Sequence, residues 1–309
     1  MNITVVGAGV SGLTTALLAA EAGHRVRVVA HRHPRDTTSA VAGASWGPHM
    51  VDDERVDAWA AASWRVFTDV AEVDGSAVRM VSGIEADPEV DATPRWAATV
   101  PGYRECLPGE APPQYRTAWR YTIPLIDMPR YLDYLSRRLD AAGVSLEHRR
   151  VHELSGLSGD VVVNCAGLES RELVPDPTMR AIRGQMVETP NPGIEEFFLG
   201  NAIDGELTVI FPHPDHLVLG GIGVYDDENT EPDPMIEADI LRRCTAVDPR
   251  IGGLPVIGRR VGLRPARATV RLERDPDDGR IVHNYGHGGS GVTLSWGCAA
   301  DVLKLVEAF

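Results

Sequence analysis

Three features of the 309-residue sequence predict a two-domain α/β fold. A strand, a glycine-rich turn, a helix and a second strand follow one another within residues 1–30, and such a βαβ unit implies a parallel sheet. A continuous apolar run at 160–167, DVVVNCAG, indicates a buried central strand. Two apolar segments within 208–223 are joined by a short turn, as in an antiparallel pair. We therefore predict an α/β protein with a Rossmann-type parallel-sheet domain and an inserted α+β domain whose sheet is mainly antiparallel.

The first elements follow from the apolar pattern. ITVV at 3–6 is a short buried strand, and the turn GAGVSG comes directly after it. An alanine-rich helix then runs to about Glu21, and Gly23 is a suitable helix stop. RVRVVA at 25–30 completes the unit as the second strand.

Later elements show the same periodicities. Leucines at helical spacing predict a helix over 128–143, and 144–154 is strand-like. ATVRLERD at 268–275 is a further strand. The last helix has one apolar face, formed by Val292, Trp296, Ala299, Leu303 and Val306.

Composition narrows the class of protein. The formal net charge of -14 disfavours nonspecific binding to nucleic acid or to an anionic membrane. The four cysteines are far apart in the sequence and include no CxxC pair, which favours reduced thiols over a disulfide framework or a metal site. The N-terminus has no signal-peptide pattern and no apolar run is long enough to span a bilayer, so we expect a cytoplasmic protein.

A GxGxxG pattern lies between the first strand and the first helix. Gly7 makes the tight turn, Gly9 lets the backbone approach a pyrophosphate, and Gly12 allows the helix to pack closely on the strand. The N-terminus of the helix then presents free N–H groups and its positive dipole end to the phosphates. The residues predicted to bind a dinucleotide here are Gly7, Ala8, Gly9, Val10, Ser11 and Gly12.

The identity of the dinucleotide stays open at this point. The acidic residue that usually binds the ribose is missing, because the second strand ends in Ala30 and His31. One explanation is NADP, with Arg32 or Arg35 meeting its 2′-phosphate. The other is FAD in a family that does not use that acid.

Three longer stretches resemble the D-amino-acid oxidase family of FAD enzymes, which includes D-aspartate oxidase. They are TTSAVAGASWGPH at 37–49, GLRPARATVRLERD at 262–275 and HNYGHGGSGVTLSWGCA at 283–299. With the glycine turn and VVVNCAG, the resemblance runs from residue 1 to about residue 305. It implies FAD as cofactor and the oxidation of D-amino acids by dioxygen, giving 2-oxo acids, ammonia and hydrogen peroxide. Hydride would pass from Cα to flavin N5, so no side-chain general base is expected.

The resemblance also divides the chain into domains. The FAD-binding domain would comprise 1–45, 130–185 and 255–309, and the substrate-binding domain 46–129 and 186–254. Four glycines just before a helix, within 286–291, let backbone N–H groups approach the edge of the flavin ring. Besides the glycine turn, the FAD-binding residues implied are His31, Arg32, Thr38, Ser39, Gly43, Ala44, Ser45, Val151, Gly288, Gly289, Ser290, Gly291, Val292 and Thr293.

The resemblance assigns the substrate carboxylate to Arg271. In the strand 268–275 this side chain shares a face with Thr269 and Glu273, while Val270 and Leu272 form the buried face. A guanidinium offers paired donors that match a carboxylate. The amine of the substrate would bind the backbone carbonyl of Gly289, and the other substrate-binding positions implied are Gly47 and Val209.

The sequence departs from the family pattern at Val209, where the family has a tyrosine that shares the substrate carboxylate. The segment that usually forms a lid is short, GNAIDGE at 200–206, and contains no tyrosine. Weaker binding, a wider pocket or a replacement donor would each accommodate this change, and His49 and His213 are the candidate donors. Two alternative functions stay open: a flavin oxidase or dehydrogenase of glycine or secondary amines, and a FAD-binding protein with a degenerate substrate site. The sequence also leaves a homodimer open.

Overall fold

The computed structural model describes residues 1–89, 96–203 and 206–309. Its helices are α1 (Val10–Glu21), α2 (Val56–Ala71), α3 (Met128–Ala141), α4 (Ser170–Leu173), α5 (Pro234–Val247) and α6 (Gly291–Glu307). Its strands are β1 (Asn2–Val6), β2 (Arg25–Ala30), β3 (Val78–Asp87), β4 (Arg104–Glu105), β5 (Thr117–Ile126), β6 (Ser145–His148), β7 (Val161–Asn164), β8 (Arg180–Pro190), β9 (Phe197–Ile203), β10 (Glu206–Pro212), β11 (His216–Ile222), β12 (Val224–Tyr225), β13 (Gly258–Arg274) and β14 (Ile281–His287).

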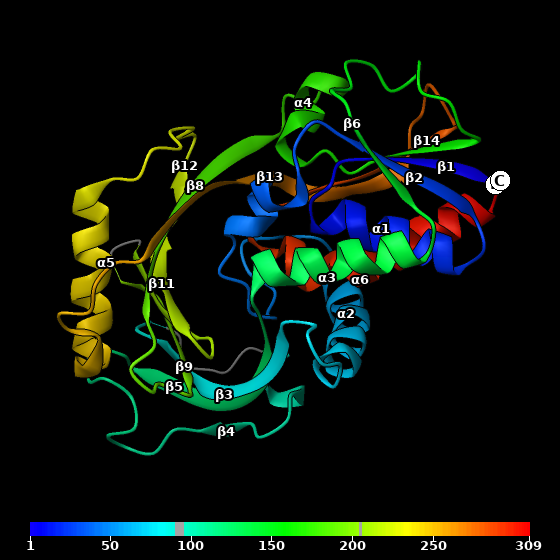
Figure 1. The fold of residues 1–309 in the computed structure, drawn as a ribbon. Coiled ribbons are helices and arrows are strands. Elements are labelled where there is room, and N and C mark those ends of the chain that lie inside the picture. Colours follow the sequence, from blue (N-terminus) through cyan, green and yellow to red (C-terminus); the bar gives the residue numbers. More distant parts are fainter. Residues whose placement is uncertain (90–95, 204–205) are drawn as a thin grey trace.

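One half of the fold is a parallel sheet. Its strands follow the order β14-β7-β1-β2-β6, and each pairs in parallel with its neighbour. Figure 1 shows α1, α3 and α6 packed together below these strands, with α2 against α6. The predicted βαβ unit and the predicted central strand β7 are therefore confirmed. Strand β6 is shorter than the sequence suggested, because pairing with β2 stops at His148.

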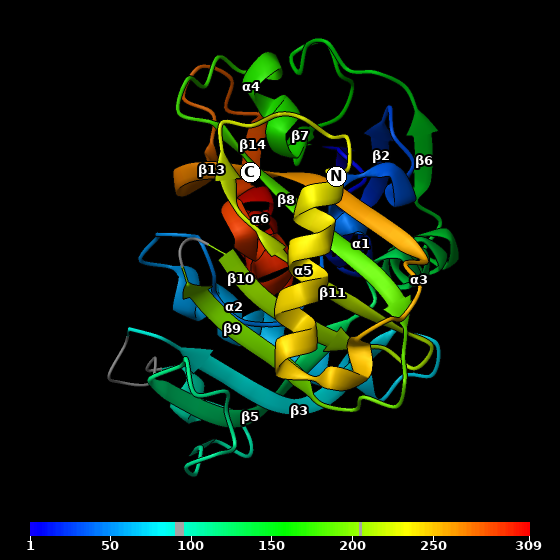
Figure 2. The same ribbon diagram turned by 90° about the vertical axis from the view of Figure 1, so that its left-hand side faces the viewer.

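The other half is mainly antiparallel. Strands β9, β10, β11 and β8 pair antiparallel in that order, and β10 and β11 form the predicted pair with Ile210 opposite Leu219. The exception is β3, which pairs parallel with β9 and antiparallel with β5. Helix α5 covers one face of this half, as Figure 2 shows. The predicted combination of a parallel and a mainly antiparallel sheet is confirmed.

The two halves form one continuous sheet because β13 is long. The first part of β13 pairs with β8, from Gly258 opposite Glu188 to Ala266 opposite Arg180. Its second part pairs with β14, where Arg271 lies opposite Tyr285. The proposed domain boundary after residue 185 falls inside β8, and the division of the chain into two domains stays a prediction.

Side chains alternate between two environments in the antiparallel half. Ile210 of β10 and Leu219 of β11 pack with Ile240 and Cys244 of α5 in a small apolar core. Val209 and Phe211 point to the other face, which lines a cavity between the two halves. This face carries the candidate substrate-binding residues described below.

Within the described ranges, none of the helices combines the length and the apolar character needed to cross a membrane.

Candidate active site

A cavity of about 670 Å³ lies between the parallel strands and the inner face of the antiparallel sheet. Most residues predicted to bind FAD or substrate line it. They are Gly7, Ala8, Gly9, Val10, Ser11, His31, Arg32, Thr38, Ser39, Gly43, Ala44, Ser45, Gly47, Val151, Val209, Gly288, Gly289, Gly291, Val292 and Thr293. The predicted residues outside this lining are Gly12, Arg271 and Ser290.

The glycine turn has the geometry of a pyrophosphate site. Gly7 has φ +111°, and a Cβ atom there would collide with the carbonyl of Cys165. The first turn of α1 lines the cavity, and the amide of Val10 donates to Ser39 Oγ at 2.9 Å. Gly12 does not line the cavity, but it allows the turn to form, because a Cβ there would collide with the carbonyl of Gly7. The glycines therefore hold the helix N-terminus open toward the cavity.

The segment after β2 forms a second wall of the cavity. Ala44 takes a positive φ of 58°, a sparsely populated conformation for a residue with a side chain. The surrounding structure maintains it: the amide of Ile126 donates to the Ala44 carbonyl at 2.9 Å, and the Trp46 amide donates to the Pro124 carbonyl at 2.9 Å. Backbone held in this way at a cavity wall is typical of a ligand-binding segment.

The arginines after β2 already have carboxylate partners. His31 and Arg32 pair with Glu169 at 3.3 and 3.6 Å. Arg35 forms an ion pair with Asp133, and this partner raises the pKa of the Arg35 guanidinium. A 2′-phosphate would have to compete with these carboxylates, so the charge pattern disfavours NADP.

The glycine-rich loop before α6 packs against residues 47–50. Gly288 has φ +56°, and a Cβ there would collide with the carbonyl of Met50. A Cβ on Gly289 would lie 2.9 Å from the His49 carbonyl. Ser290 joins the two segments: its hydroxyl accepts from the His49 amide at 2.6 Å and donates to the His49 carbonyl at 2.7 Å. Ser290 thus holds the loop against this segment from outside the cavity lining, and its contact with the cofactor stays a prediction.

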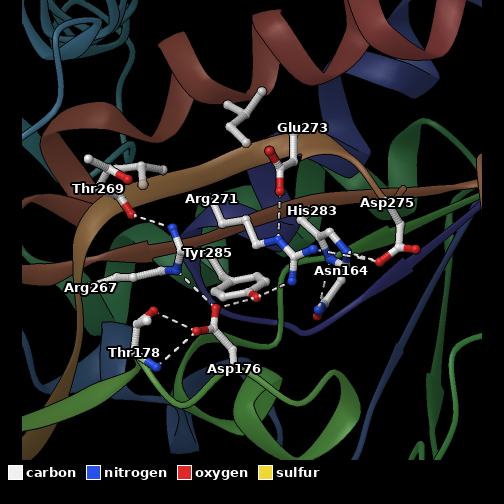
Figure 3. A network of polar contacts seen from close by, with 12 residues as sticks. Asn164, Asp176, Thr178, Arg267, Thr269, Arg271, Glu273, Asp275, His283 and Tyr285 are labelled. Carbon is white, nitrogen blue, oxygen red and sulfur yellow. Dashed lines mark hydrogen bonds and ion pairs between the residues drawn. The ribbon is translucent and has the colours of Figure 1, made fainter. Parts of the chain in front are cut away.

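Arg271 lies away from the cavity, in the polar network of Figure 3. Its guanidinium donates to Tyr285 Oη and to Glu273 Oε1, both at 2.9 Å. Tyr285 in turn donates to Asp176 at 2.8 Å. Burial alone would raise the pKa of Asp176, but hydrogen bonds from Thr178, Tyr285 and Arg267 outweigh it and bring that pKa to about 2. The described contacts therefore place Arg271 in this network and not at the cavity, and its assignment to the substrate carboxylate stays a prediction.

Arg264 lies in the cavity wall instead. Its guanidinium lies against Gly184, where a Cβ would come within 2.6 Å of Nη1, and it donates to the Ile222 carbonyl at 3.1 Å. Among the described residues no carboxylate pairs with it, and burial lowers its pKa. Arg264 received no substrate-binding role from the sequence because the strand was expected only over 268–275. The signal was its position in GLRP, since β13 begins at Gly258 and so presents Arg264 on the same face as Gly262.

The remaining candidate substrate-binding residues, His49, His213 and Val209, differ in whether they reach the cavity. His49 lines the cavity, and burial, followed by the nearby charge of Arg264, lowers the pKa of its imidazole. His213 is 2% exposed and stacks on His216 with ring centroids 4.7 Å apart, outside the cavity lining. Val209 is also buried, at the cavity face of β10. Of the two candidate replacement donors, only His49 is therefore in place. The short segment 200–206 includes residues 204 and 205, which lie outside the described ranges.

The described residues include no group of three or more His, Cys, Asp or Glu side chains arranged to hold a metal ion. All four cysteines are free thiols, and Cys165, Cys244 and Cys298 are buried.

Comparison with known proteins places the chain in a family. A family model described as FAD dependent oxidoreductase matches residues 2–305. The chain is 45% identical to a D-amino-acid oxidase of Streptomyces coelicolor, over 99% of this chain and 97% of the relative. It is 46% identical to a D-amino-acid oxidase of Rubrobacter xylanophilus (98% and 95%) and 35% identical to the D-aspartate oxidase of Homo sapiens (99% and 94%).

Solved structures show the same fold. Glycine oxidase from Geobacillus kaustophilus superposes with a TM-score of 0.84 at 17% identity, covering 99% of this chain and 94% of that one. The protein belongs to the FAD dependent oxidoreductase family and to its D-amino-acid oxidase branch, which confirms the resemblance seen in the sequence. FAD is its cofactor, and the glycine turn, the 38–45 segment and the loop before α6 are the parts of the cavity that suit it.

The position of Arg271 leads to a prediction. Replacing it, Arg271→Ala, removes donors to Tyr285 and Glu273, and we expect the free energy of unfolding to fall by about 1–3 kcal/mol. The KM for substrate should change by less than about threefold, because the side chain does not reach the cavity. Denaturant unfolding and steady-state kinetics measure both quantities. A large rise in KM with normal FAD content would return the carboxylate-binding role to Arg271.

Proposed function

We propose that this protein is an FAD-dependent oxidase of D-amino acids, which it converts to 2-oxo acids, ammonia and hydrogen peroxide. The observation that carries the proposal is Arg264, a guanidinium in the cavity wall with no carboxylate partner among the described residues. Arg264 is partly buried, and an unpaired cation that is partly withdrawn from water is stabilised by a ligand that neutralises it. The carboxylate of an amino acid supplies that charge in a bidentate geometry.

The residues around Arg264 orient the rest of the substrate. Gly289 lies beside His49, and the charge of Arg264 acts on His49, so all three belong to one end of the cavity. The Gly289 carbonyl accepts a hydrogen bond from the substrate amine. His49 is held neutral by its lowered pKa and therefore adds no second positive charge beside that amine. Two anchors in this arrangement fix the position of Cα.

FAD, when bound, supplies the acceptor for hydride from Cα and passes the electrons to dioxygen. The protein's part is to bind, to orient and to exclude water during hydride transfer. The substrate reacts as its neutral amine, so no side-chain base is needed, and the released imino acid reacts with water to give the 2-oxo acid and ammonia. Apolar side chains close the site on the sheet side: Met186, Leu199, Val209 and Phe211. They give the substrate a dry environment in which the contact with Arg264 is strengthened.

The named relatives support this function, and their identity of 45–46% extends over nearly the whole chain. The choice of the D-series follows from those relatives. Dioxygen as the acceptor, a cytoplasmic location and a homodimeric assembly remain predictions.

The first test is a screen for peroxide release. We expect D-amino acids to be oxidised and L-amino acids to be inert, with neutral, acidic, basic and bulky side chains compared in both series. Colorimetric detection of peroxide with the purified holoprotein measures this. Activity confined to L-amino acids, glycine or N-methylated amines would contradict the proposal.

Arg264 provides a second prediction. The variant Arg264→Ala should raise the KM for every D-amino acid by about 100-fold or more, because truncating one partner of a buried charge pair costs about 2–5 kcal/mol. The content of FAD should stay near normal, since Arg264 lies at the substrate end of the cavity. Arg271→Ala is the matched control from the same strand. Equal KM values for the two variants would exclude this role of Arg264.

Val209 provides a third prediction. Its side chain faces the cavity between Leu199 and Gly220 of the neighbouring strands, where a tyrosine would bring a hydroxyl to the substrate. The variant Val209→Tyr should increase kcat/KM for small D-amino acids by about two- to tenfold, because one added hydrogen bond contributes about 0.5–1.5 kcal/mol. Val209→Phe controls for ring volume. If both variants behave alike, the carboxylate is already satisfied by other donors.

A further inference from the structure

We propose that Glu85 is a specificity-determining residue that binds the cationic side chain of the substrate, so that D-amino acids with ammonium or guanidinium side chains are the preferred class. This inference rests on the proposed function, because it concerns the far end of the same site. Glu85 is buried in the cavity wall, lies away from Arg264 and has aromatic side chains beside it.

Glu85 is a buried carboxyl group in the wall of the cavity. Glu85 is only 5% exposed, and it lines the cavity from strand β3. Tyr121 Oη donates to its Oε2, and Asn201 Nδ2 donates to its Oε1 at 3.3 Å. Burial raises the pKa of Glu85, and the hydrogen bonds from Tyr121 and Asn201 partly oppose this. Among the described residues no arginine, lysine or histidine forms an ion pair with it.

A carboxylate can accept more hydrogen bonds than these two, since its oxygens offer about four lone-pair sites. A buried carboxylate without a cation is unfavourable, and a ligand cation would stabilise its charged form. Glu85 therefore has both the capacity and the electrostatic reason to bind a cation that enters the cavity.

The sheet register places Glu85 across the cavity from the carboxylate-binding end. Glu85 lies opposite Leu199, Leu199 opposite Val209, and Val209 opposite Gly220. Side chains of directly paired residues point to the same face of a sheet, so Glu85 shares the face of Val209. Arg264 donates to Ile222, which is in the same strand as Gly220.

In the sheet order, β9, β10, β11 and β8 lie between β3, which carries Glu85, and β13, which carries Arg264. The Arg264 guanidinium reaches back to Ile222 of β11, so β9 and β10 lie between that carbonyl and β3. Neighbouring strands are about 4.8 Å apart, and both side chains reach inward from a curved sheet. Such a site has a cation at one end and a carboxylate at the other. A D-amino acid with a long cationic side chain has the complementary charges, its own carboxylate toward Arg264 and its distal cation toward Glu85.

Aromatic side chains surround the approach to Glu85. Tyr121 contacts Trp96 and Phe197, with ring centroids 5.7 and 5.5 Å apart, and all three rings line the cavity. Aromatic faces attract ammonium and guanidinium groups, and they pack against the methylene stem of such side chains. The same rings give no support to an acidic substrate, whose second carboxylate Glu85 would repel.

The other cationic residues of the cavity wall belong to different segments. They follow β2 or β6 or lie in and near α4: Arg32, Arg35, Arg149, Arg150 and Arg171. Arg264 lies in β13 and belongs to none of these segments. The substrate end of the described cavity wall therefore offers one cation and one carboxyl group, a pattern that selects a substrate by both charges.

The test compares substrates that differ in distal charge. D-lysine and D-arginine are measured against the neutral analogues D-norleucine and D-citrulline, in the wild type and in Glu85→Gln. Glutamine keeps the shape and two hydrogen-bonding sites but removes the charge. We expect kcat/KM for the two cationic substrates to fall about 10- to 100-fold in the variant, because it loses a hydrogen bond between two charged groups. For the two neutral substrates, which do not make this bond, kcat/KM should change less than about twofold.

Glu196→Gln is the matched control variant. This exposed glutamate pairs with Arg120 and does not line the cavity, so its loss should leave the preference unchanged. FAD content and Tm identify any variant that fails to fold. An equal loss on all four substrates, or an unchanged preference in Glu85→Gln, would show that Glu85 only supports Tyr121 and would overturn the inference.

A binding measurement separates this inference from the proposed function. The holoprotein is titrated with 5-aminopentanoate and with pentanoate, and binding is followed through the flavin absorbance spectrum. We expect 5-aminopentanoate to bind at least about tenfold more tightly, and the difference to vanish in Glu85→Gln. If no D-amino acid is oxidised but this difference is present, the function fails and the cation site stands. If neutral D-amino acids are oxidised and the two ligands bind equally, the function stands and the cation site fails.

Discussion

The pairing of β13 with two different partners is the constraint on which the site depends. Its first part is held by β8 and its second part by β14, so one strand carries side chains into both halves of the fold. The pairing with β14 is irregular between Ala266 and Arg271. On either side of that stretch the register is fixed, because a slip by one residue would exchange the two faces of the strand. Arg264 is consequently fixed against Gly184, facing the cavity, while Arg271 is fixed against Tyr285.

The two arginines show how environment decides the role of a charge. Arg271 has Tyr285 and Glu273 as acceptors and contributes to a closed network around Asp176. Arg264 has main-chain carbonyls as acceptors and lies in a cavity wall. A guanidinium with a satisfied charge stabilises the fold, whereas one whose charge is unsatisfied binds an anion when one is available. By the same reasoning, the carboxyl group of Glu85, which has no cationic partner among the described residues, would bind a cation at the opposite end of the cavity.

The loop before α6 needs its glycines for packing, in addition to its place beside the cofactor. Gly288 and Gly289 lie so close to the carbonyls of Met50 and His49 that a side chain at either position would separate the two segments. Ser290 joins them by two hydrogen bonds to His49. This contact holds the Gly289 carbonyl and the His49 ring at one end of the cavity, so the loop positions substrate-binding groups through its packing against residues 47–50.

The sequence by itself determined the fold class, the βαβ unit, the glycine turn, the family and FAD, because these depend on local patterns: Gly7, Gly9 and Gly12 act within one turn, and the long motifs are read along the chain. It also singled out Val209, which lies in the cavity wall, while its contact with the substrate stays a prediction. Only the tertiary structure decided which arginine faces the cavity, which histidine remains as a donor, and that Ser290 acts from outside the cavity. Those outcomes depend on which distant groups meet each side chain. Arg264 and Arg271 have the same chemistry and lie in one strand, and the difference between them comes from Gly184 and Ile222 on one side and Tyr285 on the other.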